Sequence, residues 1–174
     1  MSDETFVCAT CGQRHPGLPT DYGFRLPDDV HALSYVTRYL RSRSNADLCT
    51  LDERRYFIRG IVPLPMREAE GEFCWGVWVE VGKAIHDLYA QEFEADLSSY
   101  EVVAGRLAND IPGYGGTLGL GVEVQFQGEG SRPRFTIPAT PSHALALEQR
   151  NGVSHRRHHD ILEAVGFFKE KDGA

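Results

Sequence analysis

The sequence has no long hydrophobic run. Its longest apolar stretch, residues 73–81, is interrupted by Glu80 and is far too short to cross a bilayer. The first five residues, Met-Ser-Asp-Glu-Thr, are acidic and lack the basic and apolar regions of a signal peptide. We therefore expect a cytoplasmic protein with no part in the membrane.

Basic residues are fewer than acidic residues. The 174 residues include 18 lysines and arginines against 25 aspartates and glutamates, which gives a formal net charge of −7. Non-specific binding of nucleic acid needs a basic surface, so this charge argues against it. Two local basic runs, residues 38–43 and 54–59, are expected to be solvated faces of a helix and a strand.

Cysteine is scarce. In a chain without an export signal, 4 cysteines indicate metal ligands or free thiols rather than disulfides. Cys8 and Cys11 are separated by two residues and followed by Gly12, which is the pattern of a zinc knuckle. Both sulfurs can then reach one ion at about 2.3 Å. A redox motif is disfavoured because no strand is predicted before Cys8 and no helix is predicted to begin at Cys11.

A knuckle supplies two of the four ligands that a structural zinc ion needs. His15 is close in sequence, and Cys49 lies at the start of a predicted strand, where a fixed backbone can present a ligand. Cys74 is expected to be a buried, inert thiol. His31 and His143 are more distant candidates, and the spacing alone leaves all five open.

The composition and hydrophobic pattern predict an α+β fold with a mainly antiparallel sheet and flanking helices. Helices are predicted over residues 28–43, 83–95, 100–110, 142–150 and 154–168. Hairpins are predicted over residues 55–82 and 117–138, with a further strand over 46–51. Residues 1–27 are expected to form a zinc-knuckle module that packs on a main domain of residues 28–174. In the first hairpin, helices should cover the face with Phe73, Trp75, Val77 and Val79.

Other candidate sites are weaker. The glycine-rich segment 113–121 lacks the sequence features of phosphate-binding loops, so we expect a turn into a strand. His143 and Glu148 are five residues apart, which does not place them on one helix face. His155, His158 and His159 have helical spacing and could hold a metal, but a solvated helix start explains them better. No nucleophile, base and orienting acid occur in a recognisable local pattern.

Several motifs together resemble one bacterial family, domain of unknown function 2199 (DUF2199), over roughly residues 6–160. They are Cys8-x-x-Cys11-Gly-x-x-His15-x-x-Leu18-Pro19, Asp47-Leu48-Cys49, Tyr56-Phe57-Ile58-Arg59-Gly60, Trp75-Gly76-Val77-Trp78-Val79, Leu107-Ala-Asn-Asp-Ile-Pro112-Gly113-Tyr114, and the segment from His143 to Gly152. The resemblance implies no activity. It pairs the knuckle with His15 and Cys49, so the expected zinc ligands become Cys8, Cys11, His15 and Cys49.

We expect a small zinc-binding interaction module in which the metal is structural and a sheet face or loop binds an unknown protein partner. The alternative is an enzyme with a site near His143, Glu148 and Arg150, beside Trp75 and Trp78. Four protein ligands on the zinc ion favour the first hypothesis, and three ligands plus water favour the second.

Overall fold

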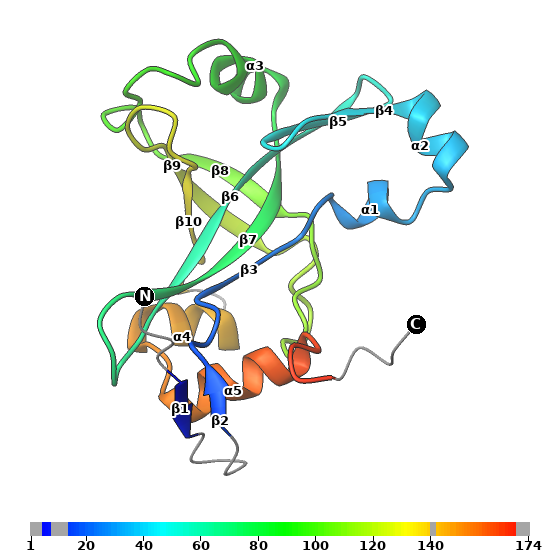
Figure 1. The fold of residues 1–174 in the computed structure, drawn as a ribbon. Coiled ribbons are helices and arrows are strands. Elements are labelled where there is room, and N and C mark those ends of the chain that lie inside the picture. The colour runs from blue at the N-terminus through cyan, green and yellow to red at the C-terminus, as the bar shows by residue number, and fades with distance from the viewer. Residues whose placement is uncertain (1–4, 8–13, 140–141, 170–174) are drawn as a thin grey trace.

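The computed structural model describes residues 5–7, 14–139 and 142–169. Within these residues, five strands close into a barrel (Figure 1). They are β6 (Arg55–Pro65), β7 (Glu72–Val81), β8 (Val103–Leu107), β9 (Gly121–Gln125) and β10 (Arg134–Thr136). Neighbours around the barrel are antiparallel except β10 and β6, which meet in parallel at Arg134 and Ile61. The predicted α+β class and mainly antiparallel sheet are confirmed.

Both predicted hairpins are present. Strands β6 and β7 pair along their length, from Tyr56 opposite Val81 to Pro65 opposite Glu72. The chain between β6 and β7 is short, so alternation of apolar residues was a sufficient guide to this pairing. Strands β9 and β10 pair as the second hairpin, with Phe135 opposite Val124.

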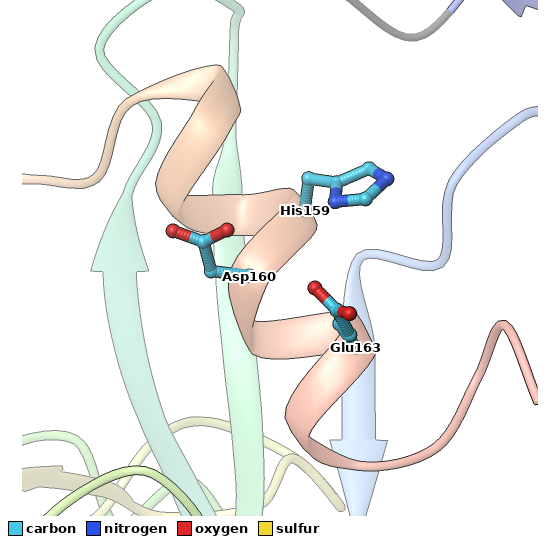
Figure 2. Close-up of side chains that lie close together, drawn as sticks. All are labelled: His159, Asp160 and Glu163. Atoms are coloured by element: carbon cyan, nitrogen blue, oxygen red, sulfur yellow. The ribbon is translucent and has the colours of Figure 1, made fainter. Parts of the chain in front are cut away.

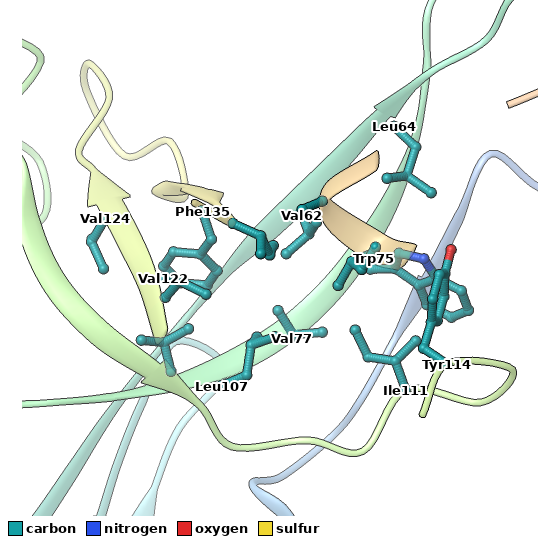
Figure 3. Packing of buried hydrophobic residues seen from close by; sticks show 14 of the residues in the cluster. Val62, Leu64, Trp75, Val77, Leu107, Ile111, Tyr114, Val122, Val124 and Phe135 are labelled. Carbon is teal, nitrogen blue, oxygen red and sulfur yellow. The ribbon is translucent and has the colours of Figure 1, made fainter. Parts of the chain in front are cut away.

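The barrel interior is the main hydrophobic core. Figure 3 shows Val62, Val77, Val122 and Phe135 converging there from four of the strands. Helices α4 (Ala144–Asn151) and α5 (His155–Ala164) add apolar side chains to the same core. Burial of the β7 face with Phe73, Trp75, Val77 and Val79 is confirmed. The expectation that helices cover this face holds only in part, because the other barrel strands enclose it and α4 and α5 add to the cover.

Three further strands extend the sheet beyond the barrel. Strand β3 (Asp21–Gly23) runs parallel to β7, while β5 (Leu48–Leu51) and β4 (Ser42–Ser44) continue from β6 in antiparallel order. Strand β4 is the last strand on this side of the sheet, so among the described residues it is an edge strand. Strands β1 (Thr5–Val7) and β2 (Arg14–Pro16) form a separate antiparallel hairpin.

The opposite face of β7 is also covered, at Trp78. Trp78 is fully buried in a second cluster with Val30, Cys49, Leu51, Phe57 and Ala108. Helix α1 (Asp28–His31) and strand β5 supply this outer layer. Two hydrogen bonds position the tryptophan: its Nε1 donates to the Phe24 carbonyl at 3.0 Å, and its backbone N–H donates to Asn109 Oδ1 at 2.8 Å.

Three helix predictions need correction. Residues 100–110 contain strand β8 and no helix, because pairing with β7 and β9 decides this segment. Gly105 is required there, since a Cβ atom would lie 2.3 Å from Val79 Cγ1. The predicted helix over 28–43 is two short helices, α1 and α2 (Tyr35–Arg41). Helix α3 (Lys83–Gln91) is shorter than the predicted 83–95. No helix in the described part of the chain is long and apolar enough to cross a membrane.

Candidate functional site

Helix α2 carries the largest group of exposed apolar side chains in the described residues. Tyr35, Val36, Tyr39 and Leu40 are exposed to 81, 65, 73 and 67 %, and we call these four the α2 surface. In the predicted helix over 28–43, apolar residues recur at helical spacing and favour one buried face: Val30, Leu33, Val36, Tyr39 and Leu40. This expectation is wrong for the last three. The chain leaves the helical path between α1 and α2, so of that pattern only Val30 is fully buried, and Leu33 packs half-buried against the same cluster.

Local hydrogen bonds fix α2 even though no residue of the helix is buried. The Ser34 side chain caps the helix by accepting from the Thr37 N–H at 3.2 Å. The half-buried Arg38 guanidinium donates to the carbonyls of Val30, His31 and Leu33 at 3.2, 2.8 and 3.0 Å. Because Arg38 ties α2 to the end of α1, the α2 surface is held in place without apolar packing of its own.

Arginines border the α2 surface. Arg41 makes a bidentate ion pair with Asp52, with N–O distances of 2.7 and 2.6 Å. Arg43 donates to the carbonyls of Tyr39 and Ser42 at 3.0 and 2.8 Å. Open hollows lie next to α2: Arg38 and Arg43 line one. Arg41, Arg43 and Arg54 line the other, together with Asp52 and Glu53. Figure 1 shows α1, α2 and β4 projecting from the barrel, so this border is accessible to another molecule.

The predicted zinc ligands are not all placed by the structure. Cys8 and Cys11 lie outside the described residues, and His15 belongs to β2, opposite Phe6. Cys49 is buried in β5, where desolvation raises the pKa of its thiol to about 11. Figure 1 shows β2 and β5 at opposite ends of the molecule, so the described backbone does not bring Cys49 to His15. Cys74 is half-buried, and burial is the main cause that raises the pKa of its thiol.

A strand does lead into the Cys8–Cys11 motif, contrary to the sequence-based expectation. Strand β1 ends at Val7, which pairs with Arg14 of β2. Residues 8–13 therefore connect the two strands of a hairpin. No helix follows the motif directly, because β2 comes next.

The histidines of α5 are less solvated than expected. His158 and His159 are only 2 and 4 % exposed, so the prediction of a solvated helix start is wrong for both. His158 Nε2 donates to the Pro19 carbonyl at 2.8 Å, and burial lowers the pKa of its imidazole. His159 stacks on Phe168 with ring centroids 4.4 Å apart.

Metal-binding groups gather along α5. Ligand atoms of His159, Asp160 and Glu163 all lie within 4.8 Å of one another. Figure 2 shows the His159 ring and the Glu163 carboxylate on the same side of successive turns, whereas Asp160 points to a different side of the helix. His155 begins the same helix four residues before His159. This spacing places the two histidines on one face of α5.

The residues of the alternative enzyme hypothesis have structural contacts. His143 caps α4, since its Nδ1 accepts from the Leu145 N–H at 3.1 Å and its Nε2 donates to the Gly115 carbonyl at 2.7 Å. Glu148 accepts from the Tyr114 hydroxyl and from Arg157 Nε, the latter at 2.5 Å. Arg150 is exposed. The contacts of His143 and Glu148 serve to fix α4 against its neighbours.

The sequence analysis did not identify Asn109 and Arg38, whose side chains join neighbouring segments through hydrogen bonds. Asn109 is fully buried, and its Nδ2 donates to the Leu26 carbonyl and to Asp28 Oδ1, both at 2.9 Å. Its position between Leu107 and Pro112 lies within a motif quoted above, which was the available signal. Arg38 lies in a basic run that was expected to be solvated. No adjacent residue in the sequence indicated that its guanidinium would donate to three carbonyl groups.

Residues 7–153 match the family model described as "Uncharacterized protein conserved in bacteria (DUF2199)". No curated protein and no solved structure matches the chain.

Proposed function

The chain belongs to the DUF2199 family, and we propose that it is an interaction module whose α2 surface binds an acidic region of a partner protein. The exposure of Tyr35, Val36, Tyr39 and Leu40 carries this proposal. Contiguous apolar patches on monomers commonly mark binding sites. Tyrosine and arginine are also the residue types enriched at the centres of protein interfaces.

The charge around the α2 surface indicates the chemistry of the partner. Residues 31–44 contain three arginines and no aspartate or glutamate, although acidic residues outnumber basic ones by 25 to 18 in the whole chain. A basic border in an acidic protein complements an acidic partner surface and steers its approach. A symmetric contact between two α2 surfaces would instead place arginines against arginines. The net charge of −7 opposes a nucleic-acid partner.

Zinc has a structural role in this proposal. Cys8 and Cys11 act as thiolate ligands of one ion in the β1–β2 hairpin, which is too short to hold a core of its own. The free energy of metal binding then becomes folding free energy of this hairpin. The barrel keeps its own core and does not depend on the ion. Cys49 is not proposed as a ligand, because it is buried at the other end of the molecule.

Photo-cross-linking in bacteria tests the binding role. A benzophenone side chain replaces Val36 in the α2 surface, and a control chain carries it at Val102, which is 50 % exposed outside that surface. We expect a cross-linked protein at position 36 only. The captured protein is then purified and titrated against the chain. Binding should weaken at least about tenfold in Tyr39→Ser, and it should weaken with salt if the partner surface is acidic.

Several results would overturn the proposal. The first is equal cross-linking at positions 36 and 102. The second is cross-linking only to nucleic acid or only to a second copy of the chain. The third is a captured protein whose affinity for the chain changes neither in Tyr39→Ser nor with salt concentration.

A further inference from the structure

We propose that Arg59, next to Arg132, forms a binding site for a carboxylate group on the outer face of β6. The site lies outside the α2 surface and does not depend on the function proposed above. Asp47, Arg59 and Gly76 belong to three of the sequence motifs quoted above, and the proposed function gives them no role.

The Arg59 side chain lies on the outside of the barrel. Arg59 alternates along β6 with Ile58 and Val62 of the main core, so its side chain points to the opposite face. The guanidinium lies beside strand β3, where a Cβ atom at Gly23 would be 2.6 Å from Arg59 Nη2. Nη1 donates to the Ala46 carbonyl at the long distance of 3.4 Å. Glycine at position 23 therefore leaves open the space that the guanidinium occupies.

Arg59 makes no ion pair with a carboxylate in the described part of the chain. Its Nε is buried and has no hydrogen-bond partner among the same residues. Asp47 pairs instead with Arg132, whose Nε lies 2.8 Å from Asp47 Oδ1. Burial lowers the pKa of Arg59, the nearby charge of Arg132 lowers it further, and Asp47 offsets this shift only in part. Because a partly buried charge without a partner is costly, an anion that binds Arg59 removes part of that cost.

The balance of charge favours a carboxylate as the ligand. The two positive charges of Arg59 and Arg132 and the one negative charge of Asp47 leave one positive charge uncompensated. A carboxylate carries a single negative charge, whereas a phosphate monoester carries about −1.5 to −2 and would place excess negative charge near Asp47. Since Nε is buried, the two Nη groups of Arg59 are the donors, and their spacing suits the two oxygens of a carboxylate.

Acetate is the first probe, followed by proton–nitrogen NMR of the arginine Nε–H groups in the full chain. Sodium chloride at the same concentration is the reference for ionic strength. We expect the Arg59 signal, assigned by its loss in Arg59→Gln, to shift with acetate and reach saturation. The signal of Arg106, an exposed arginine of β8, is the internal control and should not saturate.

Two variants separate binding from a structural role of Arg59. The signal followed in both is the backbone N–H of residue 59, which donates to the Asp47 carbonyl at 2.9 Å. Arg59→Gln should weaken acetate binding at least about tenfold, because it removes charge-assisted hydrogen bonds. Gly23→Ala keeps every charge but places a methyl group where the guanidinium lies, so it should also weaken binding. Gly121→Ala is the matched control, since its Cβ would meet nothing within 4 Å, and it should bind acetate unchanged.

Three results would overturn the proposal. The first is an Arg59 signal that responds to acetate as the Arg106 signal does. The second is acetate binding that is the same in Arg59→Gln, Gly23→Ala and the unchanged protein, with urea unfolding used to show that each variant is folded. The third is tighter binding of inorganic phosphate than of acetate, which would contradict the carboxylate assignment.

Two further probes identify the source of the carboxylate. Succinate represents a free carboxylic acid, and a short blocked peptide rich in glutamate represents an acidic protein segment. Both are titrated at equal carboxylate concentration against the unchanged protein and Gly23→Ala. The probe that binds more tightly, and that loses affinity in Gly23→Ala, identifies the source. Binding of neither probe above the level of chloride would overturn the proposal.

Discussion

His158 Nε2 donates to the carbonyl oxygen of Pro19 at 2.8 Å and thereby joins α5 to the segment between the N-terminal hairpin and the barrel. The His158 ring also lies against Phe73, with centroids 5.3 Å apart. One buried side chain thus links three parts of the chain that are far apart in sequence.

This link should make stability depend on pH. Burial lowers the pKa of His158 below 6.5, and the hydrogen bond to the Pro19 carbonyl offsets this shift only in part. The unfolded chain then binds a proton more readily than the folded chain, so the free energy of unfolding falls as the pH drops below about 6.5. In His158→Gln, urea unfolding at pH 7.5 and 5.5 should show a smaller difference. An equal difference in both proteins would contradict the prediction.

Asn109 should be among the most sensitive polar positions. Replacing it with alanine leaves the buried Trp78 N–H and the Leu26 carbonyl without their partner. We expect a loss of about 3 kcal/mol in the free energy of unfolding, because each buried group left unsatisfied costs roughly 1–3 kcal/mol. Asn45→Ala is the matched control, since the side chain of the exposed Asn45 also hydrogen-bonds two backbone groups, the N–H groups of Asp47 and Leu48. The prediction fails if urea unfolding gives equal losses in the two variants.

Gly60 should be required for barrel closure. A Cβ atom at this position would lie 2.5 Å from Phe135 Cζ and 2.5 Å from the Pro133 carbonyl oxygen. The backbone near β10 would have to shift, so Gly60→Ala should cost about 3 kcal/mol in thermal or urea unfolding. A Cβ at Gly121 in β9 would meet nothing within 4 Å, and Gly121→Ala should change stability by less than about 0.5 kcal/mol. Similar values for both variants would argue against this packing.

The α2 surface should contribute little to stability. Tyr39 is 73 % exposed and Val36 65 %, so the pair Val36→Ser/Tyr39→Ser should leave the free energy of unfolding within about 0.5 kcal/mol. Leu64→Ala, at a fully buried position, should cost about 2–5 kcal/mol in the same assay. A large loss in the α2 variant would mean that these side chains serve the fold rather than a partner.

The sequence predicted local pairing better than closure of the barrel. The β6–β7 hairpin follows from apolar alternation on two strands joined by a short link, and it was predicted correctly. The segment that contains β8 was predicted as a helix, and Val103 and Leu107, four residues apart, fit a helical face as well as a strand. The segment forms a strand because it pairs with β7 near Val79 and with β9 near Val122. The local spacing of apolar residues gives no information about this pairing.

The candidate sites were predicted only in part. Periodicity showed that residues 30–40 have apolar side chains at helical spacing, but it could not show whether a partner element covers them. The break between α1 and α2 left Tyr39 and Leu40 exposed. The His155–His159 spacing was visible in the sequence. The burial of His159 and the link of the neighbouring His158 to Pro19 required the tertiary structure.

X-ray absorption at the zinc edge tests most directly the claim that Cys8 and Cys11 hold a structural zinc ion. In the full chain purified without added metal, we predict a zinc ion with at least two sulfur ligands at about 2.3 Å and no water ligand. A chain without zinc, or an ion with an oxygen ligand from water, would contradict the account.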